Sequence, residues 1–273
     1  MSTATKNSVE KAGKGSSMFA SIVIPLALVI CIGIYKFVLG NPANFAGNDP
    51  ANHPLPGNYL GIVYKGGIMV PVLMSLMLIV IIFCFERFFT LTKASGSGSV
   101  ENFVRKVQAS LANNDTKSAL NACDQQKGSV ANVIRAGLLR YDEMQKDTTM
   151  DKDQKVLAIQ KEVEEATSLE LPMLEKNLVI LATISSIATL MGLLGTVIGM
   201  IKAFAALATA GSPDAIALAN GISEALINTA LGISTSALAI IMYNYFTTKI
   251  DGLTYSIDEI GFSLAQTFAS KNH

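Results

Sequence analysis

Four hydrophobic stretches divide the chain, and each is long enough to cross a lipid bilayer as an α-helix. They are predicted at residues 18–39, 67–90, 178–210 and 211–247. In the last stretch, Ser212 is expected as the N-cap and Pro213 as the first helical residue. At ~1.5 Å per residue this helix is longer than the ~30 Å hydrocarbon core, so we expect it to extend into water.

The polar segments between these stretches predict different structures. Residues 40–66 are rich in Pro, Asn and Gly, which predicts an extended loop on the far side of the membrane. Residues 91–177 contain a Ser-Gly break at 95–99, which ends in an N-cap, and then helical periods of apolar residues. The charged run 151–175 is expected to continue as a helix into the third stretch without a turn, with a kink at Pro172.

The two ends of the chain complete the predicted fold class. Residues 1–17 form a polar leader and residues 248–273 a tail. We interpret residues 18–39 as an uncleaved anchor, because the apolar run is longer than a signal-peptide h-region and no clear A-x-A cleavage site follows it. The chain is therefore predicted to be an all-α, polytopic membrane protein with four transmembrane helices and a helical cytoplasmic extension.

The positive charges predict which face of the membrane each polar segment occupies. Lysines precede the first stretch, Arg87 and Lys93 follow the second, Lys176 precedes the third and Lys249 follows the fourth. Four passes place all of these residues on one face, which the positive-inside rule assigns to the cytoplasm. Both termini are therefore expected in the cytoplasm.

Small residues follow one face of the third stretch. A water-soluble helix would instead place its large apolar residues on its one buried face. The small residues recur at alternating steps of three and four, and large Ile, Leu and Phe residues occupy the other faces. This pattern is typical of membrane helices whose backbones pack closely or that line a polar passage. The residues of this face are Ala182, Ser185, Thr189, Gly192, Thr196, Gly199, Ala203, Ala206 and Ala210.

The fourth stretch carries a similar small and polar face. Its members fall within an arc of about 140° when the helix is drawn at 100° per residue. The two helices together are expected to line an interior, so that the chain forms an oligomer around a central lumen with Leu and Ile facing lipid. The residues of this arc are Gly221, Glu224, Ala225, Asn228, Thr229, Gly232, Thr235, Ser236 and Ala239.

Composition and charge exclude several other chemistries. Half of the residues are hydrophobic, 15% are charged and the formal net charge is zero, so no basic field indicates nucleic-acid binding. Three cysteines and two histidines without a Cys–His cluster provide neither a zinc site nor a Ser-His-Asp triad. We interpret the cysteines as reduced packing residues, and we expect no enzyme activity, no cofactor and no metal.

Four side chains within the last two stretches carry chemistry that needs an explanation. A carboxylate such as Glu224 costs several kcal/mol inside a membrane unless it is paired or hydrated, and ion passage and structural pairing are equal alternatives for it. Lys202 is one candidate partner, although snorkelling of its ammonium group to the interface is the favoured interpretation. The hydroxyls of Thr196 and Thr229 can guide a proton but hold no charge at neutral pH. From chemistry alone, hydrogen bonding to their own helix or between helices is favoured for them.

Two ordered motifs resemble those of a known family. The runs GLLGTVIGM at 192–200 and GISEALINTALG at 221–232 are similar to the paired signatures of the MotA/TolQ/ExbB proton-channel family. Tyr243-Asn244 at the end of the last stretch fits the ExbB/TolQ branch. The resemblance covers the last two stretches by motif and residues 67–175 by layout only, and the stretch 18–39 is an additional N-terminal span.

This resemblance implies an inner-membrane pentamer whose lumen holds the transmembrane helices of an ExbD/TolR-like dimer. An acid on that partner would carry the proton, and proton flow would drive work on the outer membrane through a TonB-like energiser. By the same resemblance, Thr196 and Thr229 match lumen threonines and Glu224 matches a membrane glutamate, so these three residues are the expected proton pathway. Further lumen-lining or packing positions are Thr189, Gly192, Gly195, Gly199, Asn228, Gly232, Thr235 and Ser236.

The sequence departs from the family at some positions and leaves other interpretations open. Thr189 and Leu238 stand where many relatives have proline, so helix bends inferred from the family lack support here. A secondary transporter would show internal repeats and broken helices, and no convincing repeat is found. In a non-conducting membrane scaffold, the small faces would serve packing alone.

Overall fold

The computed structural model describes residues 3–208 and 214–271, and it describes side-chain surroundings from Phe19 onward. This part of the chain is built from helices, as the hydrophobic pattern predicts, and the all-α class is confirmed. Among the described residues, four helices are long and apolar enough to cross a membrane. The elements are α1 (Thr3–Ile34), η1 (Tyr35–Leu39), η2 (Pro42–Asn44), η3 (Ala46–Asn48), α2 (Tyr59–Tyr64), α3 (Met69–Ser95), α4 (Val100–Ala112), α5 (Thr116–Gln126), α6 (Gly128–Lys146), α7 (Lys152–Glu175), α8 (Leu178–Leu207) and α9 (Ala215–Lys271).

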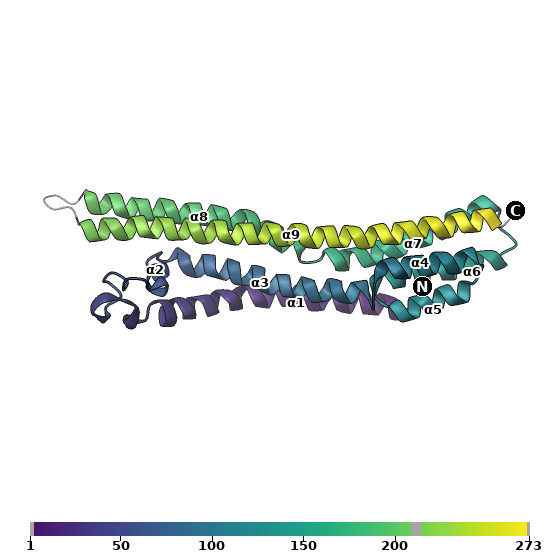
Figure 1. Ribbon diagram of the computed structural model, residues 1–273, viewed down its shortest axis with the longest axis horizontal. Helices are drawn as coiled ribbons and strands as arrows, with labels where there is room; N and C mark the ends of the chain where they lie inside the picture. Colours follow the sequence, from purple (N-terminus) through teal and green to yellow (C-terminus); the bar gives the residue numbers. More distant parts are fainter. Residues whose placement is uncertain (1–2, 209–213, 272–273) are drawn as a thin grey trace. The chain divides into compact units, whose positions relative to one another are not determined.

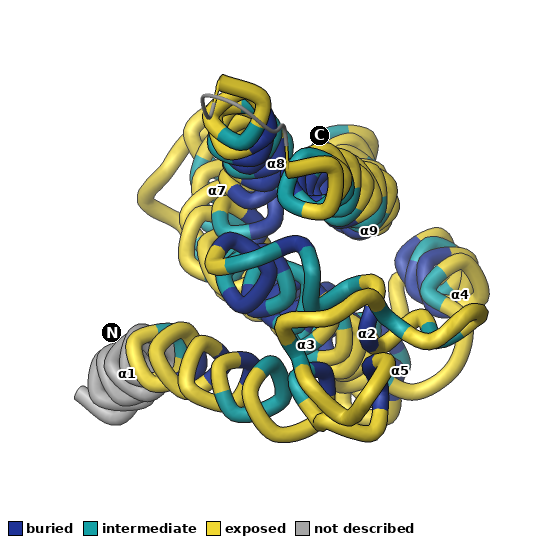
Figure 2. The backbone as a smooth tube through the Cα atoms, turned by 90° about the vertical axis from the view of Figure 1, so that its left-hand side faces the viewer, coloured by how far each residue is buried: buried dark blue, intermediate teal, exposed yellow. Residues whose placement is uncertain are grey.

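The helices form two compact units, of which the first comprises Met1–Cys84 and Val179–Tyr243. Within it, α8 and the first half of α9 run side by side, and α1 lies along α3 (Figure 1). The ring of Phe19 meets Phe83 edge to face, with centroids 6.0 Å apart. Val23, Ala27 and Cys31 are buried at four-residue steps on α1. Between Phe19 and Ile34, most residues of α1 outside this stripe are exposed, as Figure 2 shows, and most of these exposed residues are apolar.

Residues 40–66 are not the extended loop that their composition predicts. The amide of Asn44 donates hydrogen bonds to the carbonyls of Val38 and Leu39, at 2.9 and 3.0 Å. Asn58 donates to Asn44 Oδ1 at 3.0 Å, and the Lys65 ammonium donates to the carbonyls of Pro50 and Ala51, at 3.0 Å each. The Asn residues that indicate a loop in the sequence therefore fold this segment into short helical turns by satisfying its backbone carbonyls.

The second unit comprises Phe85–Leu178 and Asn244–His273. The apolar periods that the sequence shows in α4 and α6 are buried there, which confirms the predicted helical faces. Tyr141 packs edge to face on Phe268 at 5.1 Å, and the side chain of Ser99 accepts a hydrogen bond from Asn102 as the predicted N-cap of α4. The buried residues of these periods are Phe103, Val104, Val107, Leu111, Val130, Val133, Ile134, Leu138 and Tyr141.

The helix predicted to run from residue 151 into the third stretch is interrupted. Helix α7 passes through Pro172 and ends at Glu175, and α8 begins at Leu178. Asn177 between them has a φ of +66°, a conformation that Asn adopts more readily than most residues. The prediction of a continuous helix was wrong because Asn177 was not recognised as a turn signal.

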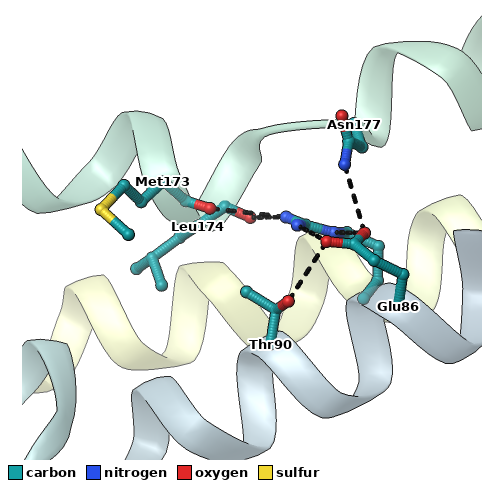
Figure 3. A network of polar contacts seen from close by, with 6 residues as sticks. Glu86, Thr90, Met173, Leu174 and Asn177 are labelled. Atoms are coloured by element: carbon teal, nitrogen blue, oxygen red, sulfur yellow. Dashed lines mark hydrogen bonds and ion pairs between the residues drawn. The ribbon is translucent and has the colours of Figure 1, made fainter. Parts of the chain in front are cut away.

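Arg87 of α3 occupies this interruption. Its guanidinium group donates to the carbonyl of Leu174 at 3.1 Å, and so satisfies a backbone oxygen at the end of α7. It also forms a bidentate pair with Glu86, at 2.6 and 2.5 Å. Thr90 and Asn177 donate to the same carboxylate, as Figure 3 shows. Arg87 is 2% exposed, so the second unit holds a buried polar network at the α7–α8 junction.

Helix α9 differs at both ends from the predicted fourth stretch. It begins at Ala215, and the carboxylate of Asp214 accepts hydrogen bonds from the backbone N–H groups of Ile216 and Ala217 at 3.0 Å, as an N-cap residue does. The predicted cap residues Ser212 and Pro213 lie outside the described residues. The helix then continues for 57 residues to Lys271, so the predicted tail is helical as far as it is described.

Candidate functional site at the α8–α9 interface

Helices α8 and α9 pack backbone against backbone through their small residues. A Cβ placed on Gly199 would lie 2.6 Å from the backbone nitrogen of Ala225 and 2.7 Å from the carbonyl oxygen of Gly221. A Cβ placed on Gly232 would lie 2.6 Å from the carbonyl oxygen of Ala188 and 2.8 Å from the Cα of Gly192. The buried faces of the two helices are turned toward each other in Figure 2. The glycines at these positions are therefore required for the close approach of the two helices.

Most of the large apolar residues of α8 and of the first half of α9 point away from this interface. This arrangement is the inverse of a soluble helix pair, as the sequence indicates, although Ile184 is buried rather than exposed. Surfaces of this kind are suited to contact with lipid or with other membrane helices. The exposed residues include Ile187, Leu190, Leu193, Leu194, Val197, Ile201 and Phe204 on α8 and Leu226, Ile233 and Ile241 on α9.

The hydroxyl groups of Thr196 and Thr229 contact each other across the interface. Thr196 Oγ1 also lies 3.2 Å from the carbonyl of Gly192, and Thr229 Oγ1 lies 3.1 Å from the carbonyl of Ala225. Each hydroxyl has one proton, so only two of these three contacts can be hydrogen bonds at one time. The pair thus has two arrangements that point in opposite directions, in which one hydroxyl donates to the other and the second donates to its own helix.

Glu224 and Lys202 form an ion pair between the same two helices. The Lys202 ammonium donates to both carboxylate oxygens, at 2.7 and 2.8 Å. The side chain of Glu224 is 8% exposed, whereas that of Lys202 is 52% exposed. The favoured expectation was that the Lys202 side chain snorkels to the membrane–water interface. In the structure its ammonium group is held by Glu224, the alternative partner. The pairing satisfies a carboxylate that would otherwise be costly to bury.

A glycine turn before α3 completes the site. Asn228 is fully buried, and its Nδ2 donates to the carbonyl of Gly66 at 2.8 Å. Gly67 has a φ of +72°, and a Cβ placed on it would lie 2.4 Å from Glu224 Oε1. The Gly66-Gly67 pair ahead of a hydrophobic stretch indicates a turn, and this was the only signal in the sequence. It does not indicate which helix the turn will contact, so the sequence does not predict that these glycines belong to the site.

The remaining candidate residues lie along the same interface. Thr189 is half-buried, and a Cβ placed on Gly195 would lie 2.4 Å from the Cβ of Asn228. Ser236 Oγ donates to the carbonyl of Ser185. Thr235 is fully buried, and within the described residues its hydroxyl has no hydrogen-bond partner; the same is true of Asn228 Oδ1. The structure therefore places hydroxyl, amide and carboxylate groups along the α8–α9 interface, in separate contacts. The described residues contain no cluster of metal-ligating side chains.

Comparison with known proteins places this site in a wider group. Residues 125–259 match the MotA/TolQ/ExbB proton channel family. The chain is 34% identical over 124 residues to the Tol-Pal system protein TolQ of Pseudomonas aeruginosa. This alignment covers 45% of this chain and 54% of that protein. It is 30% identical over 112 residues to the biopolymer transport protein ExbB of Xanthomonas campestris, in an alignment that covers 41% of this chain and 44% of that protein.

A longer alignment exists with a more distant relative. An ExbB homologue of Methanothermobacter thermautotrophicus is 27% identical over 195 residues, which is 71% of this chain and 65% of that protein. The chain thus spans about half the length of the bacterial relatives that it matches. The matched residues include α8, the first half of α9 and the hydroxyl and carboxylate groups of the site. By its motifs and by this match over residues 125–259, the chain is a multi-pass membrane protein of the MotA/TolQ/ExbB proton channel family.

Proposed function

We propose that this protein is the ExbB/TolQ-like subunit of a proton-driven motor in the bacterial inner membrane. It would couple the proton-motive force to work on the outer membrane through an ExbD/TolR-like dimer and a TonB-like energiser. The proposed assembly is a pentamer with the partner's helices in its lumen and with both termini of each chain in the cytoplasm. The observation that carries the proposal is the contact between Thr196 and Thr229 on two helices whose backbones touch.

The hydroxyl pair is suited to guide a proton but not to store its charge. Reversal of the Thr196–Thr229 hydrogen bond moves the donor from one helix to the other without any change in net charge. Glu224 is an acid, but its carboxylate is already held by Lys202. We therefore place the titrating acid that carries the proton on the partner, with Thr196, Thr229 and Glu224 along its path.

The first test replaces each hydroxyl of the pair. We expect Thr196→Ala and Thr229→Ala to reduce proton-driven activity to background while the oligomer stays intact, because alanine fits the small face but cannot pass a proton. Thr183→Ala is the matched control, since Thr183 is an exposed α8 residue whose hydroxyl donates only to its own helix, at Val179. Activity is measured after co-reconstitution with the partner, and oligomer mass by native mass spectrometry. Wild-type activity in both assembled variants would contradict the proposed pathway.

That outcome would favour the scaffold interpretation. The close backbone approach at Gly199 and Gly232 supports a packing role for the small faces between α8 and α9. A scaffold would need this packing but not the hydroxyl groups. The threonine variants therefore distinguish the two functions directly.

The second test concerns the location of the acid. We expect the purified chain alone to conduct protons poorly in liposomes, because the hydroxyl pair holds no charge and Glu224 is ion-paired. Proton flux is measured with an entrapped pH-sensitive dye after a potential is applied, and liposomes containing the chain with its partner serve as the comparison. Flux through the chain alone that equals flux through the complex would refute the assignment of the acid to the partner.

A further inference from the structure

The segment that precedes α3 lies outside the residues matched by the family, and its contacts lead directly to Glu224. We infer that Tyr35–Gly67 is a brace that positions Glu224 in the site. The brace comprises η1, the folded segment after it and the Gly66–Gly67 turn. This inference rests on the proposed function only for the activity measurement described below.

The first contact of the brace joins the end of α1 to the end of α2. A five-residue π-helical turn, η1, follows α1 directly. Within it, the Tyr35 hydroxyl donates to the carbonyl of Tyr64 at 3.2 Å, and the two rings stack with centroids 4.7 Å apart. A Cβ placed on Gly40 would lie 2.7 Å from the ring of Tyr64, so this glycine leaves room for the stacked pair. Single-turn π-helices are frequently found at functional positions.

The segment between these tyrosines has a small core of its own. Phe45 is 1% exposed and meets the ring of Tyr64 at 5.4 Å, and Leu39 is also buried. The Lys65 ammonium, held by two loop carbonyls, lies 5.6 Å from the centre of the Phe45 ring. Burial lowers the pKa of Lys65. These contacts fix Tyr64 and Lys65, the two residues immediately before the glycine turn.

The glycine turn transmits this fixed position to α9. The carbonyl of Gly66 receives the Asn228 amide, and Gly67 lies against the carboxylate of Glu224. Asn228 and Glu224 are four residues apart, so both side chains project from the same face of α9. Lys202 of α8 holds the carboxylate through both of its oxygens. Glu224 is therefore confined by the turn and by a cation, and a shift of the turn changes the contacts of its carboxylate.

The brace is tested by two variants at its Tyr35–Tyr64 contact, each with a matched control. Tyr35→Phe removes the hydroxyl that donates to Tyr64, and Tyr59→Phe removes a hydroxyl from a tyrosine that is 79% exposed. Gly40→Ala displaces the Tyr64 ring, whereas Gly33→Ala adds a Cβ that meets nothing within 4 Å. Lys202→Met serves as the positive control, because it removes the cation from Glu224 directly.

The main readout is the reactivity of Glu224 in the intact oligomer. The probe is dicyclohexylcarbodiimide, and mass spectrometry of the peptide that contains Glu224 counts both the adduct and any amide formed with Lys202. We expect Tyr35→Phe and Gly40→Ala to change the modification rate by about two- to tenfold, the range that corresponds to the loss of one hydrogen bond. Tyr59→Phe and Gly33→Ala should match the wild type. A wild-type rate in Tyr35→Phe would overturn the inference even if Gly40→Ala failed to assemble.

The second readout separates this inference from the proposed function. The pH profile of proton-driven activity is measured for the same variants, and we expect it to shift for Tyr35→Phe and to stay in place for Tyr59→Phe. If Tyr35→Phe changes the reactivity of Glu224 but the wild-type complex shows no proton-driven activity, the proposed function is refuted and the brace is not. If the wild-type complex is active and Tyr35→Phe leaves the reactivity of Glu224 unchanged, the brace alone is refuted.

Discussion

Arg87→Met is expected to lower the free energy of unfolding by about 3–5 kcal/mol, the cost of removing one partner of a buried ion pair. Arg87 is 2% exposed and its partner Glu86 is 22% exposed. Methionine fills a similar volume, but it leaves the carboxylate without its bidentate partner and the Leu174 carbonyl without its donor. Because the network lies where α7 ends, we expect the junction before α8 to become disordered first.

An exposed ion pair in the same unit provides the control for this prediction. Arg135 pairs with Asp124 at 3.3 Å, and their side chains are 50% and 62% exposed. Arg135→Met should change stability by at most about 1 kcal/mol. Arg87→Lys should fall between the two, because lysine keeps the charge but loses the bidentate geometry. Thermal unfolding in detergent measures the series, and equal stability of Arg87→Met and Arg135→Met would contradict a structural role for the network.

Gly199→Ala is expected to destabilise the α8–α9 pair by about 1–3 kcal/mol, the usual cost of overpacking. The new Cβ would meet backbone atoms of Ala225 and Gly221 at 2.6 and 2.7 Å, and backbone cannot rotate away as a side chain can. The helices must therefore separate, which also lengthens the contact between Thr196 and Thr229. Loss of stability and loss of proton-driven activity should occur together.

The control for this change should shift stability in the opposite direction. Gly33 lies inside α1, and a Cβ at this position meets nothing within 4 Å. Gly33→Ala should stabilise by up to about 1 kcal/mol, because alanine has the higher helix propensity. Thermal unfolding of the two variants in the same detergent gives the comparison. A stabilising effect of Gly199→Ala would contradict the close approach of the α8 and α9 backbones at Gly199.

The helical faces could be predicted because they repeat along the chain. The small-residue faces of α8 and α9 follow from spacing alone, and so do the buried positions of α4 and α6, because a helix fixes which residues share a face. The same regularity made Thr196 and Thr229 recognisable as members of two such faces. Their direct contact follows once the two faces pack together, since the glycines allow the backbones to touch.

The contacts of single polar side chains could not be predicted in the same way. Lys202 has two plausible destinations in a membrane helix, and only the position of α9 decides that it reaches Glu224. Asn44 and Asn58 are residues typical of loops, yet the hydrogen bonds donated by their side-chain amides hold the segment before α3 in a compact fold. Asn177 ends a helix by a positive φ, and Arg87, which satisfies the end of that helix, lies 87 residues from Leu174 in the chain.

The sequence by itself determined which four of the described helices are long and apolar enough to cross a membrane, the inverted faces of the last two, and the family that residues 125–259 match. These features depend on residue type and periodicity, which are local properties of the chain. The tertiary structure alone decided that Glu224 is held by Lys202 and lies against Gly67, and that Tyr35 contacts Tyr64 shortly before the Gly66–Gly67 turn. Such contacts join residues far apart in the chain, and their formation depends on distances that only the packed helices fix.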